Sequence, residues 1–193
     1  MCIMGACQVD CGAVDNHLCD MQCHAGAATC TGPQGRRVGC APLRWDFEDD
    51  SRGWDILDGS NAVKAISFSS DVFRGGARAR RIDVSVNGLD NLVQISTPLC
   101  PSPGSIDGSG LTMSVYVNIQ GAPDKSLCLV GAKTASSTIE ANGSIASNSG
   151  WTRLSRRLDA DARQLSALVF TCLLPLGTTS WSGTIYLDDA SLQ

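Results

Sequence analysis

The sequence predicts an all-β protein, an antiparallel β-sandwich that is preceded by a small cysteine-rich segment. Short runs in which apolar and polar residues alternate recur from residue 43 onwards, and this period of two is typical of half-buried strands. Clusters of Gly, Pro, Asn and Asp separate the runs and predict turns. Seven of the ten cysteines fall within the first 40 residues, which sets that segment apart from the rest of the chain.

The clearest strand is predicted over residues 111–119, where apolar side chains on one face alternate with polar ones on the other. Asn87-Gly88 and Asn142-Gly143 are among the predicted turns, and the only helix that the pattern allows covers residues 160–165. Eight or nine strands over roughly 150 residues favour a sandwich. The other predicted strands are 63–69, 80–86, 92–97, 126–131, 151–158, 165–173 and 183–192.

Two regions follow from this pattern. Residues 1–42 contain seven cysteines and both histidines and show no apolar periodicity, whereas residues 43–193 contain all the predicted strands. The boundary lies at Cys40-Ala41-Pro42. We therefore expect a covalently cross-linked segment followed by one β domain.

The composition excludes several classes of protein. The chain of 193 residues has a net charge of −4 and no run rich in Lys and Arg, which argues against nucleic acid or an anionic membrane as the partner. No stretch reaches the ~20 apolar residues that span a bilayer. Two histidines and two glutamates leave few general acids or bases, and the common catalytic motifs are missing. We therefore expect a protein that is not an enzyme.

Five segments carry a family resemblance. They are residues 45–49 (WDFED), 53–54 (GW), 73–79 (FRGGARA), 150–154 (GWTRL) and 181–192 (WSGTIYLDDASL). Their order resembles that of the bacterial carbohydrate-binding modules of the family 4/9/22 type, which are galactose-binding-like β-jelly rolls. The resemblance covers residues 43–193 and implies a non-catalytic module that holds a secreted or surface protein against polysaccharide.

The resemblance also implies a structural calcium ion that links the first strand of the domain to the last. Glu48, Asp71 and Asp188 match its carboxylate ligands, and Asp46 and Arg74 match residues that supply main-chain carbonyl oxygens. Ca²⁺ accepts such a mixture of oxygen ligands, and the cation would offset repulsion between the carboxylates. Its expected role is to stabilise the folded state. The alternative is that the three carboxylates only face solvent at the ends of strands.

Sugar-binding sites combine flat aromatic rings with amide or charged hydrogen-bonding groups on a rigid sheet. The polar side of strand 111–119 presents Tyr116 and Asn118, with Gln120 just beyond it, and related modules bind glycan on a sheet face of this kind. These residues are the first candidates for a ligand site. Gln94 is expected to lie beside them on a neighbouring strand.

The four tryptophans have two interpretations, packing in the core or stacking against sugar. Trp45 and Trp54 belong to the opening motif, where packing is the better explanation. Trp181 follows a polar loop and is the best candidate for an exposed platform, and Trp151 is predicted to cap the core or to flank the groove.

The cysteines of residues 1–42 predict a knot of three disulfides, with a zinc site as the alternative. The Cys-x3-Cys spacings beside His24 fit zinc, but a segment poor in large apolar residues needs covalent cross-links, and the extracellular setting that the resemblance implies favours disulfides. Cys2 is left over, and the six cysteines from Cys7 to Cys40 allow 15 connectivities, so the pairing stays open. Cys100 and Cys128 sit at the edges of neighbouring predicted strands and are predicted to pair, and Cys172 is predicted to be a buried free thiol.

The sequence thus predicts a carbohydrate-binding module on a secreted or cell-surface bacterial protein, with a polysaccharide or oligosaccharide as ligand and further domains in the parent protein. The N-terminus lacks the pattern of a secretory signal, so the export signal is expected upstream of this chain. The alternative is a structural or adhesion β-sandwich that contacts proteins or spaces domains without binding sugar. An aromatic content of only 5% keeps that alternative open, because the fold alone does not establish function.

Overall fold

A computed structural model describes residues 43–48, 54–99, 105–134, 136–160, 162–176 and 180–193. It also describes the backbone of four two-residue strands, β1 (Cys2–Ile3), β2 (Ala6–Cys7), β3 (Gln22–Cys23) and β4 (Cys30–Thr31). β1 pairs with β2 and β3 pairs with β4, both antiparallel. The disulfide pairing and the alternative zinc site predicted for residues 1–42 lie outside the described residues, as does Cys100.

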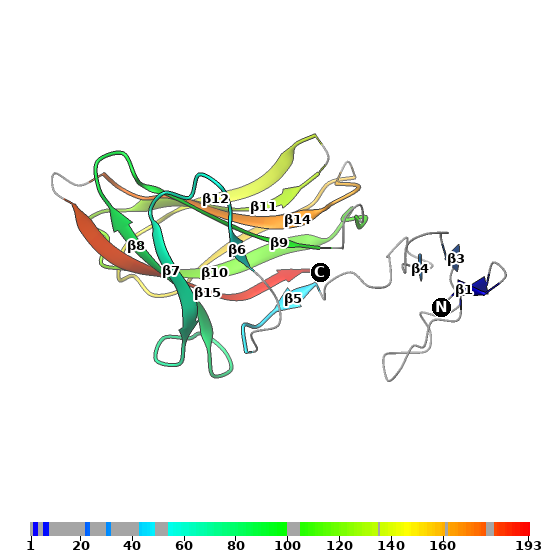
Figure 1. The fold of residues 1–193 in the computed structure, drawn as a ribbon, viewed down its shortest axis with the longest axis horizontal. Coiled ribbons are helices and arrows are strands. Elements are labelled where there is room, and N and C mark those ends of the chain that lie inside the picture. Colours follow the sequence, from blue (N-terminus) through cyan, green and yellow to red (C-terminus); the bar gives the residue numbers. More distant parts are fainter. Residues whose placement is uncertain are drawn as a thin grey trace.

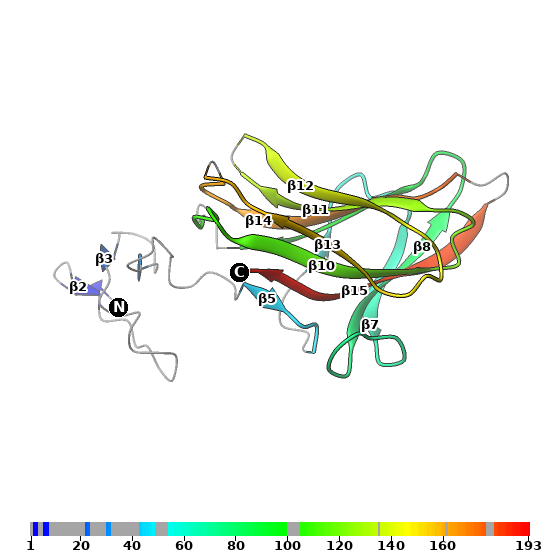
Figure 2. The same cartoon turned by 180° about the vertical axis from the view of Figure 1, so that it is seen from behind.

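Two antiparallel sheets form the sandwich (Figures 1 and 2). The six-stranded sheet has the order β13-β10-β15-β8-β7, and β5 pairs with β15 beyond the end of β8. Figure 1 shows β5 alongside the C-terminal half of β15, so the first and last strands of the domain are neighbours. The strands of this sheet are β5 (Arg44–Trp45), β7 (Val63–Ser69), β8 (Ala79–Val86), β10 (Thr112–Gln120), β13 (Thr152–Arg157) and β15 (Trp181–Leu192).

The five-stranded sheet has the order β12-β11-β14-β9-β6. No helix occurs among the described residues, so the helix that the pattern allowed at 160–165 is not seen in the part of that range that is described. No described helix is long and apolar enough to cross a membrane. The strands of this sheet are β6 (Asp55–Ile56), β9 (Leu92–Pro98), β11 (Ser126–Lys133), β12 (Thr138–Ile145) and β14 (Ala167–Leu173).

The predicted all-β sandwich is confirmed, and each of the eight strands predicted by alternation is present within a few residues of its expected bounds. The turn predicted at Asn142-Gly143 is wrong, because both residues lie inside β12. Gly143 pairs with Cys128 across the sheet, and a Cβ at this position would come within 2.8 Å of Leu154 Cδ2. The glycine therefore serves close packing between the sheets rather than a change of chain direction.

The core lies between the two sheets and follows from the alternation. Every second residue of β10 from Met113 to Ile119 is at most 1% exposed, and these side chains belong to one apolar cluster with Phe170 of β14 and Ile95 of β9. Because successive side chains of a strand point to opposite faces, the polar residues of β10 must point away from this core.

Two of the tryptophans close one side of the core, as the sequence predicted. Trp45 is 2% exposed and Trp54 is fully buried. Their ring centroids lie 6.1 Å apart in an edge-to-face arrangement, and Phe47 lies 6.2 Å from Trp54. Such aromatic pairs add to the stabilisation that burial alone provides. The opening motif of the domain is therefore mainly a packing motif.

The disulfide of the domain joins Cys128 of β11 to Cys172 of β14. The two residues are direct cross-strand partners and both are fully buried. The predicted pairing of Cys100 with Cys128 and the predicted free thiol at Cys172 are therefore wrong. Both predictions assumed that β11 lies beside the strand before Cys100, whereas β14 is inserted between β11 and β9.

We expect the loss of this disulfide to destabilise the domain. The double substitution Cys128→Ala/Cys172→Ala should lower the free energy of unfolding by about 2–4 kcal/mol, because the bond restricts the unfolded chain. Urea unfolding of the oxidised full-length chain measures this difference. Non-reducing peptide mapping should recover the peptides containing Cys128 and Cys172 as one linked species, and free thiols at both positions would contradict the assignment.

Candidate functional site

The outer side of the six-stranded sheet collects polar and aromatic side chains from four strands, and we call it the polar face. Tyr116 pairs with Arg153 of β13 on one side and with Asp188 of β15 on the other. Directly opposite residues of antiparallel strands point to the same side of a sheet, so each pair shares this face. Its members are Tyr116, Asn118 and Gln120 of β10, Arg153 of β13, Thr184, Tyr186 and Asp188 of β15, and Arg81 and Asp83 of β8.

Tyr116 lies against two guanidinium groups. The Cζ atom of Arg74 is 3.6 Å from the centroid of the Tyr116 ring, and that of Arg153 is 5.9 Å away. Arg74 reaches this ring from the loop between β7 and β8, and its Nη1 forms an ion pair with Asp189. A cation over an aromatic ring is attracted by the electrons of the ring face. The centre of the polar face is therefore both aromatic and cationic.

Asn118 follows Tyr116 on this side of β10 and pairs with Tyr186 of β15. It is only 7% exposed, and its Oδ1 atom has no hydrogen-bond partner among the described residues. Trp151 immediately precedes β13, and the register that pairs Thr152 with Val117 places Trp151 opposite Asn118. Continuation of this register favours the polar face over a cap on the core for Trp151.

The other end of the polar face is a shallow depression of about 450 Å³. It is lined by residues of β7, β8 and β15 that include Lys64, Asp83, Ser85 and Thr184. Asp83 accepts hydrogen bonds from Arg81 Nε at 2.9 Å and from Thr184 Oγ1 at 3.3 Å. Gln120 pairs with Thr184, so β10 connects the depression to Tyr116.

Two predicted site residues lie elsewhere. Gln94 belongs to β9 of the five-stranded sheet, where its Nε2 donates to Thr171 Oγ1 at 3.4 Å, so its expected place beside β10 is wrong. Trp181 pairs with Val86, packs against the core, and donates from Nε1 to the Pro175 carbonyl oxygen at 2.9 Å. Its expected place beside Tyr116 is wrong as well, because its position in β15 alternates toward the core side.

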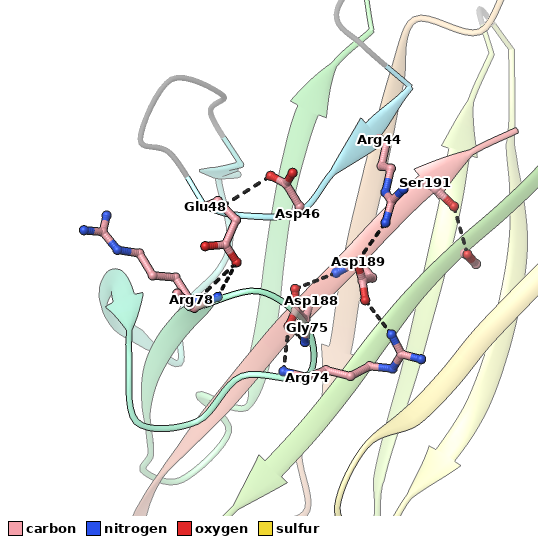
Figure 3. Close-up of polar contacts among 11 residues, drawn as sticks. Arg44, Asp46, Glu48, Arg74, Gly75, Arg78, Asp188, Asp189 and Ser191 are labelled. Atoms are coloured by element: carbon pink, nitrogen blue, oxygen red, sulfur yellow. Dashed lines mark hydrogen bonds and ion pairs between the residues drawn. The ribbon is translucent and has the colours of Figure 1, made fainter.

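Two carboxylates hold the loop that carries Arg74, as Figure 3 shows. The side chain of Asp188, which is fully buried, accepts hydrogen bonds at Oδ2 from the main-chain N–H groups of Arg74 at 2.7 Å and Gly75 at 3.1 Å. Glu48 Oε1 accepts from the N–H groups of Ala77 at 2.8 Å and Arg78 at 3.2 Å. We call this arrangement the carboxylate clasp.

Burial raises the pKa of Asp188 above the usual range of an aspartate. The main-chain donors of Arg74, Gly75 and Asp189 act in the opposite direction, because hydrogen bonds to a carboxylate favour its charged form. The last of these donates to Oδ1 at 2.8 Å. Among the described residues, the hydrogen bonds to the Asp188 side chain come from N–H groups of the backbone, and those from Arg74 and Gly75 fix the path of the loop.

Main-chain N–H groups already contact several of the oxygens that the sequence predicts as calcium ligands. A cation needs oxygen lone pairs directed at it, whereas Glu48 Oε1 and both oxygens of Asp188 already face N–H groups. Among the described residues no three His, Cys, Asp or Glu side chains form a group that could hold a metal. Calcium binding at Asp46, Glu48, Asp71, Arg74 and Asp188 therefore stays a prediction from the sequence.

The sequence contains a signal for the clasp that the prediction missed. Gly76 has a φ of +67°, and a Cβ there would collide with the carboxylate of Glu48. A glycine is therefore required both by the backbone conformation and by the close approach of the side chain. The pair Gly75-Gly76 in the FRGGARA motif indicates a loop that packs closely against a side chain from another segment, which is Glu48 here.

Comparisons with solved structures place this fold among known proteins. The structure is similar to one described as a carbohydrate-binding module of the β-sandwich superfamily, with a TM-score of 0.57 and 17% identity over 86% of this chain and 71% of that chain. The fold is that of the β-sandwich carbohydrate-binding modules. The CBM27-1 module of Caldicellulosiruptor saccharolyticus, solved with mannohexaose, has a TM-score of 0.58 and 24% identity over 78% of this chain and 95% of that chain.

The C-terminal family 22 module of Clostridium thermocellum Xyn10B is also similar, with a TM-score of 0.52 and 13% identity over 80% of this chain and 94% of that chain. No known protein family matches the sequence, and no curated protein is significantly similar to it. The similarity is therefore one of fold, and the chemistry of the site has to be argued from this chain's own residues.

We expect Asp188→Asn to loosen the carboxylate clasp. An asparagine has one acceptor oxygen, and its NH₂ group would face main-chain donors, so at least one buried N–H loses its partner. The free energy of unfolding should fall by about 1–3 kcal/mol, measured by urea denaturation. Asp159→Asn is the matched control, because Asp159 is exposed. Equal stability of the Asp188 variant and the wild type would show that the clasp contributes nothing.

The same geometry gives an expectation for metal removal. Because the clasp oxygens are satisfied by N–H groups, the melting temperature of the chain should be the same in EDTA and in millimolar CaCl₂. Differential scanning calorimetry measures it, with MgCl₂ as the control for ionic strength. A rise in melting temperature that only Ca²⁺ produces and EDTA reverses would instead confirm the calcium site predicted from the sequence.

Proposed function

We propose that residues 43–193 are a non-catalytic carbohydrate-binding module that attaches its parent protein to polysaccharide through the polar face. The observation that carries this proposal is the grouping of Tyr116, Asn118 and Gln120 on one side of β10, with Trp151 at the position opposite Asn118. Sugar rings have apolar C–H faces beside rows of hydroxyl groups, and aromatic and amide side chains complement the two.

The solved structures of similar fold support this function. One of these structures is a CBM27 module in complex with mannohexaose, and another holds the Clostridium thermocellum CBM22-1-GH10 modules in complex with xylohexaose. Both ligands are linear oligosaccharides, and the second protein joins its module to a xylanase. By analogy we propose that this domain binds a linear glycan and works beside other domains in the parent protein.

The arrangement of acidic residues supports a non-catalytic role. Hydrolysis of a glycosidic bond needs two carboxyl groups that flank the same sugar. Glu48 belongs to the carboxylate clasp, whereas Glu140 lies in β12 of the other sheet. The two glutamates of the chain therefore cannot act on one bond, and no histidine lies in residues 43–193.

A secreted or cell-surface location on a bacterial protein is part of the same proposal. The Cys128–Cys172 disulfide supports it, because disulfides persist mainly in oxidising compartments outside the cytosol. One structure of similar fold joins its module to a xylanase, and an attachment module on a secreted protein serves the same kind of setting.

Native affinity electrophoresis of the full chain tests the proposal, using gels that contain xylan, mannan, β-glucan or a uronic-acid polymer. We expect retardation in at least one gel. Tyr116→Ala and Trp151→Ala should each weaken the binding by at least about tenfold, as central aromatic contacts do.

Gln94→Ala is the matched control, because Gln94 lies on the opposite sheet. Unchanged mobility in every gel, with circular dichroism showing a folded chain, would favour the structural or adhesion domain that contacts proteins. Loss of retardation in Gln94→Ala but not in Tyr116→Ala would move the site to the five-stranded sheet and contradict the assignment to the polar face.

A further inference from the structure

We infer that the glycan bound at the polar face is anionic, with the carboxylate groups of uronic-acid sugars recognised by arginines around Tyr116. This inference rests on the proposed function and adds the class of ligand to it. Two arginines lie against the ring, and two more lie on neighbouring strands of the same face. Arg74 and Arg153 contact it, Arg157 lies further along β13, and Arg44 lies on β5.

The position of these arginines follows from the strand register. Arg153 pairs with Tyr116, and Arg157 pairs with Thr112, which lies on the same side of β10 as Tyr116. Residues separated by four positions in a strand point to the same side, at a spacing of about 13 Å. Both arginines are exposed. The edge strand β13 thus presents two guanidinium groups in a row along the polar face.

The positive charge of this row is not balanced by nearby carboxylates. Within the part of the chain that the structure describes, neither Arg153 nor Arg157 forms an ion pair. Arg44 and Arg74 share the carboxylate of Asp189, with Arg44 Nη2 at 3.6 Å from Asp189 Oδ1. The carboxylate of Asp188 is buried and occupied by main-chain N–H groups. Arg153 and Arg157 are therefore left without a carboxylate partner among the described residues.

Arg74 is placed to hold a carboxylate in a fixed position. Its main-chain N–H is bound to Asp188, its ring contact with Tyr116 fixes the guanidinium plane, and its Nη1 is held by Asp189. A guanidinium has five N–H donors, and only one of those of Arg74 has a partner among the described residues. The remaining donors present the planar fork that binds a carboxylate through two parallel hydrogen bonds.

In this arrangement Tyr116 is not an open platform on which a sugar ring stacks. With Arg74 only 3.6 Å from the ring centroid, the ring supports the arginine, and the arginine contacts the sugar. Arg153, on the neighbouring strand, supplies a second cation beside the same ring. A neutral sugar would leave both guanidinium groups without a charged partner, whereas a uronate supplies one.

The test compares ligands that differ only in charge. Polygalacturonate and alginate are each used with ionised carboxylate groups, here called the free acid, and as the neutral ester. Xylan serves as a neutral polymer and dextran sulfate as a sulfated one. Isothermal titration calorimetry of the full chain measures the affinities at low and high salt. We expect a free acid to bind at least about tenfold more tightly than its ester, and high salt to remove most of the difference.

The variants assign that difference to the arginines. Arg153→Ala and Arg74→Ala should each reduce the affinity for the free acid by about tenfold, as loss of one charge-assisted contact does, and leave the affinity for the ester unchanged. Lys133→Ala removes a positive charge from the five-stranded sheet and should have no effect. Retention of binding in Arg153→Lys, with reduced affinity, would further indicate that the fork geometry matters.

The outcomes separate this inference from the proposed function. Equal affinity for acid and ester, or binding of xylan in preference to both acids, would overturn the inference and leave the glycan-binding function standing. Tighter binding of dextran sulfate than of either acid would overturn the assignment to carboxylated sugars. The chain could instead bind all polyanions equally, duplex DNA included, and keep that binding in Tyr116→Ala. That result would contradict a specific site at the polar face. No binding of any polysaccharide would overturn the proposed function itself.

Discussion

The hydrogen bonds that the buried carboxylate of Asp188 accepts are the contacts on which the polar face depends. Asp188 lies in the central strand β15, where the register against β10 shifts between Ser114 and Tyr116. Asp189 has a positive φ of 45° at this irregularity. The shift lets two consecutive aspartates act on one loop. The carboxylate of Asp188 accepts hydrogen bonds from the loop's main-chain N–H groups, and the carboxylate of Asp189 pairs with the side chain of Arg74. Bulges commonly redirect side chains in this way.

The loop that Asp188 fixes determines the chemistry of the surface. If residues 74–78 were not held by Asp188 and Glu48, Arg74 would lose its contact with Tyr116. The ring would then be an open aromatic platform of the kind that suits a neutral sugar. The clasp thus couples the stability of the loop to the choice of ligand. In this structure main-chain N–H groups contact Asp188 Oδ2 and Glu48 Oε1, so the loop is held by hydrogen bonds.

The sequence was sufficient for the local features and insufficient for those that depend on strand order. Alternation along β10 predicted which of its residues face away from the core, so the placement of Tyr116, Asn118 and Gln120 on the outer side was predicted correctly. Gln94 was misplaced because alternation does not say to which sheet a strand belongs. For the same reason Cys128 and Cys172 were assigned wrongly, because their pairing depends on β14 being next to β11.

Two further features were missed for other reasons. β12 was missed because Asn142-Gly143 has the composition of a turn, although Gly143 serves packing. Arg74 was expected to supply a carbonyl oxygen, and its stacking on Tyr116 needs a contact that no local pattern encodes.

The net charge of the chain does not oppose an anionic ligand at this face. The total of −4 is an average over the whole surface, whereas a bound polymer is influenced mainly by charges within the Debye length of about 8 Å at physiological ionic strength. Around Tyr116 those charges are mostly arginines, because the nearest acids are either paired or buried. The overall acidity instead opposes non-specific adhesion to polyanions elsewhere on the molecule. A small cationic area on an acidic protein therefore favours a specific contact over a general one, which is the property that an attachment module for a charged polysaccharide requires.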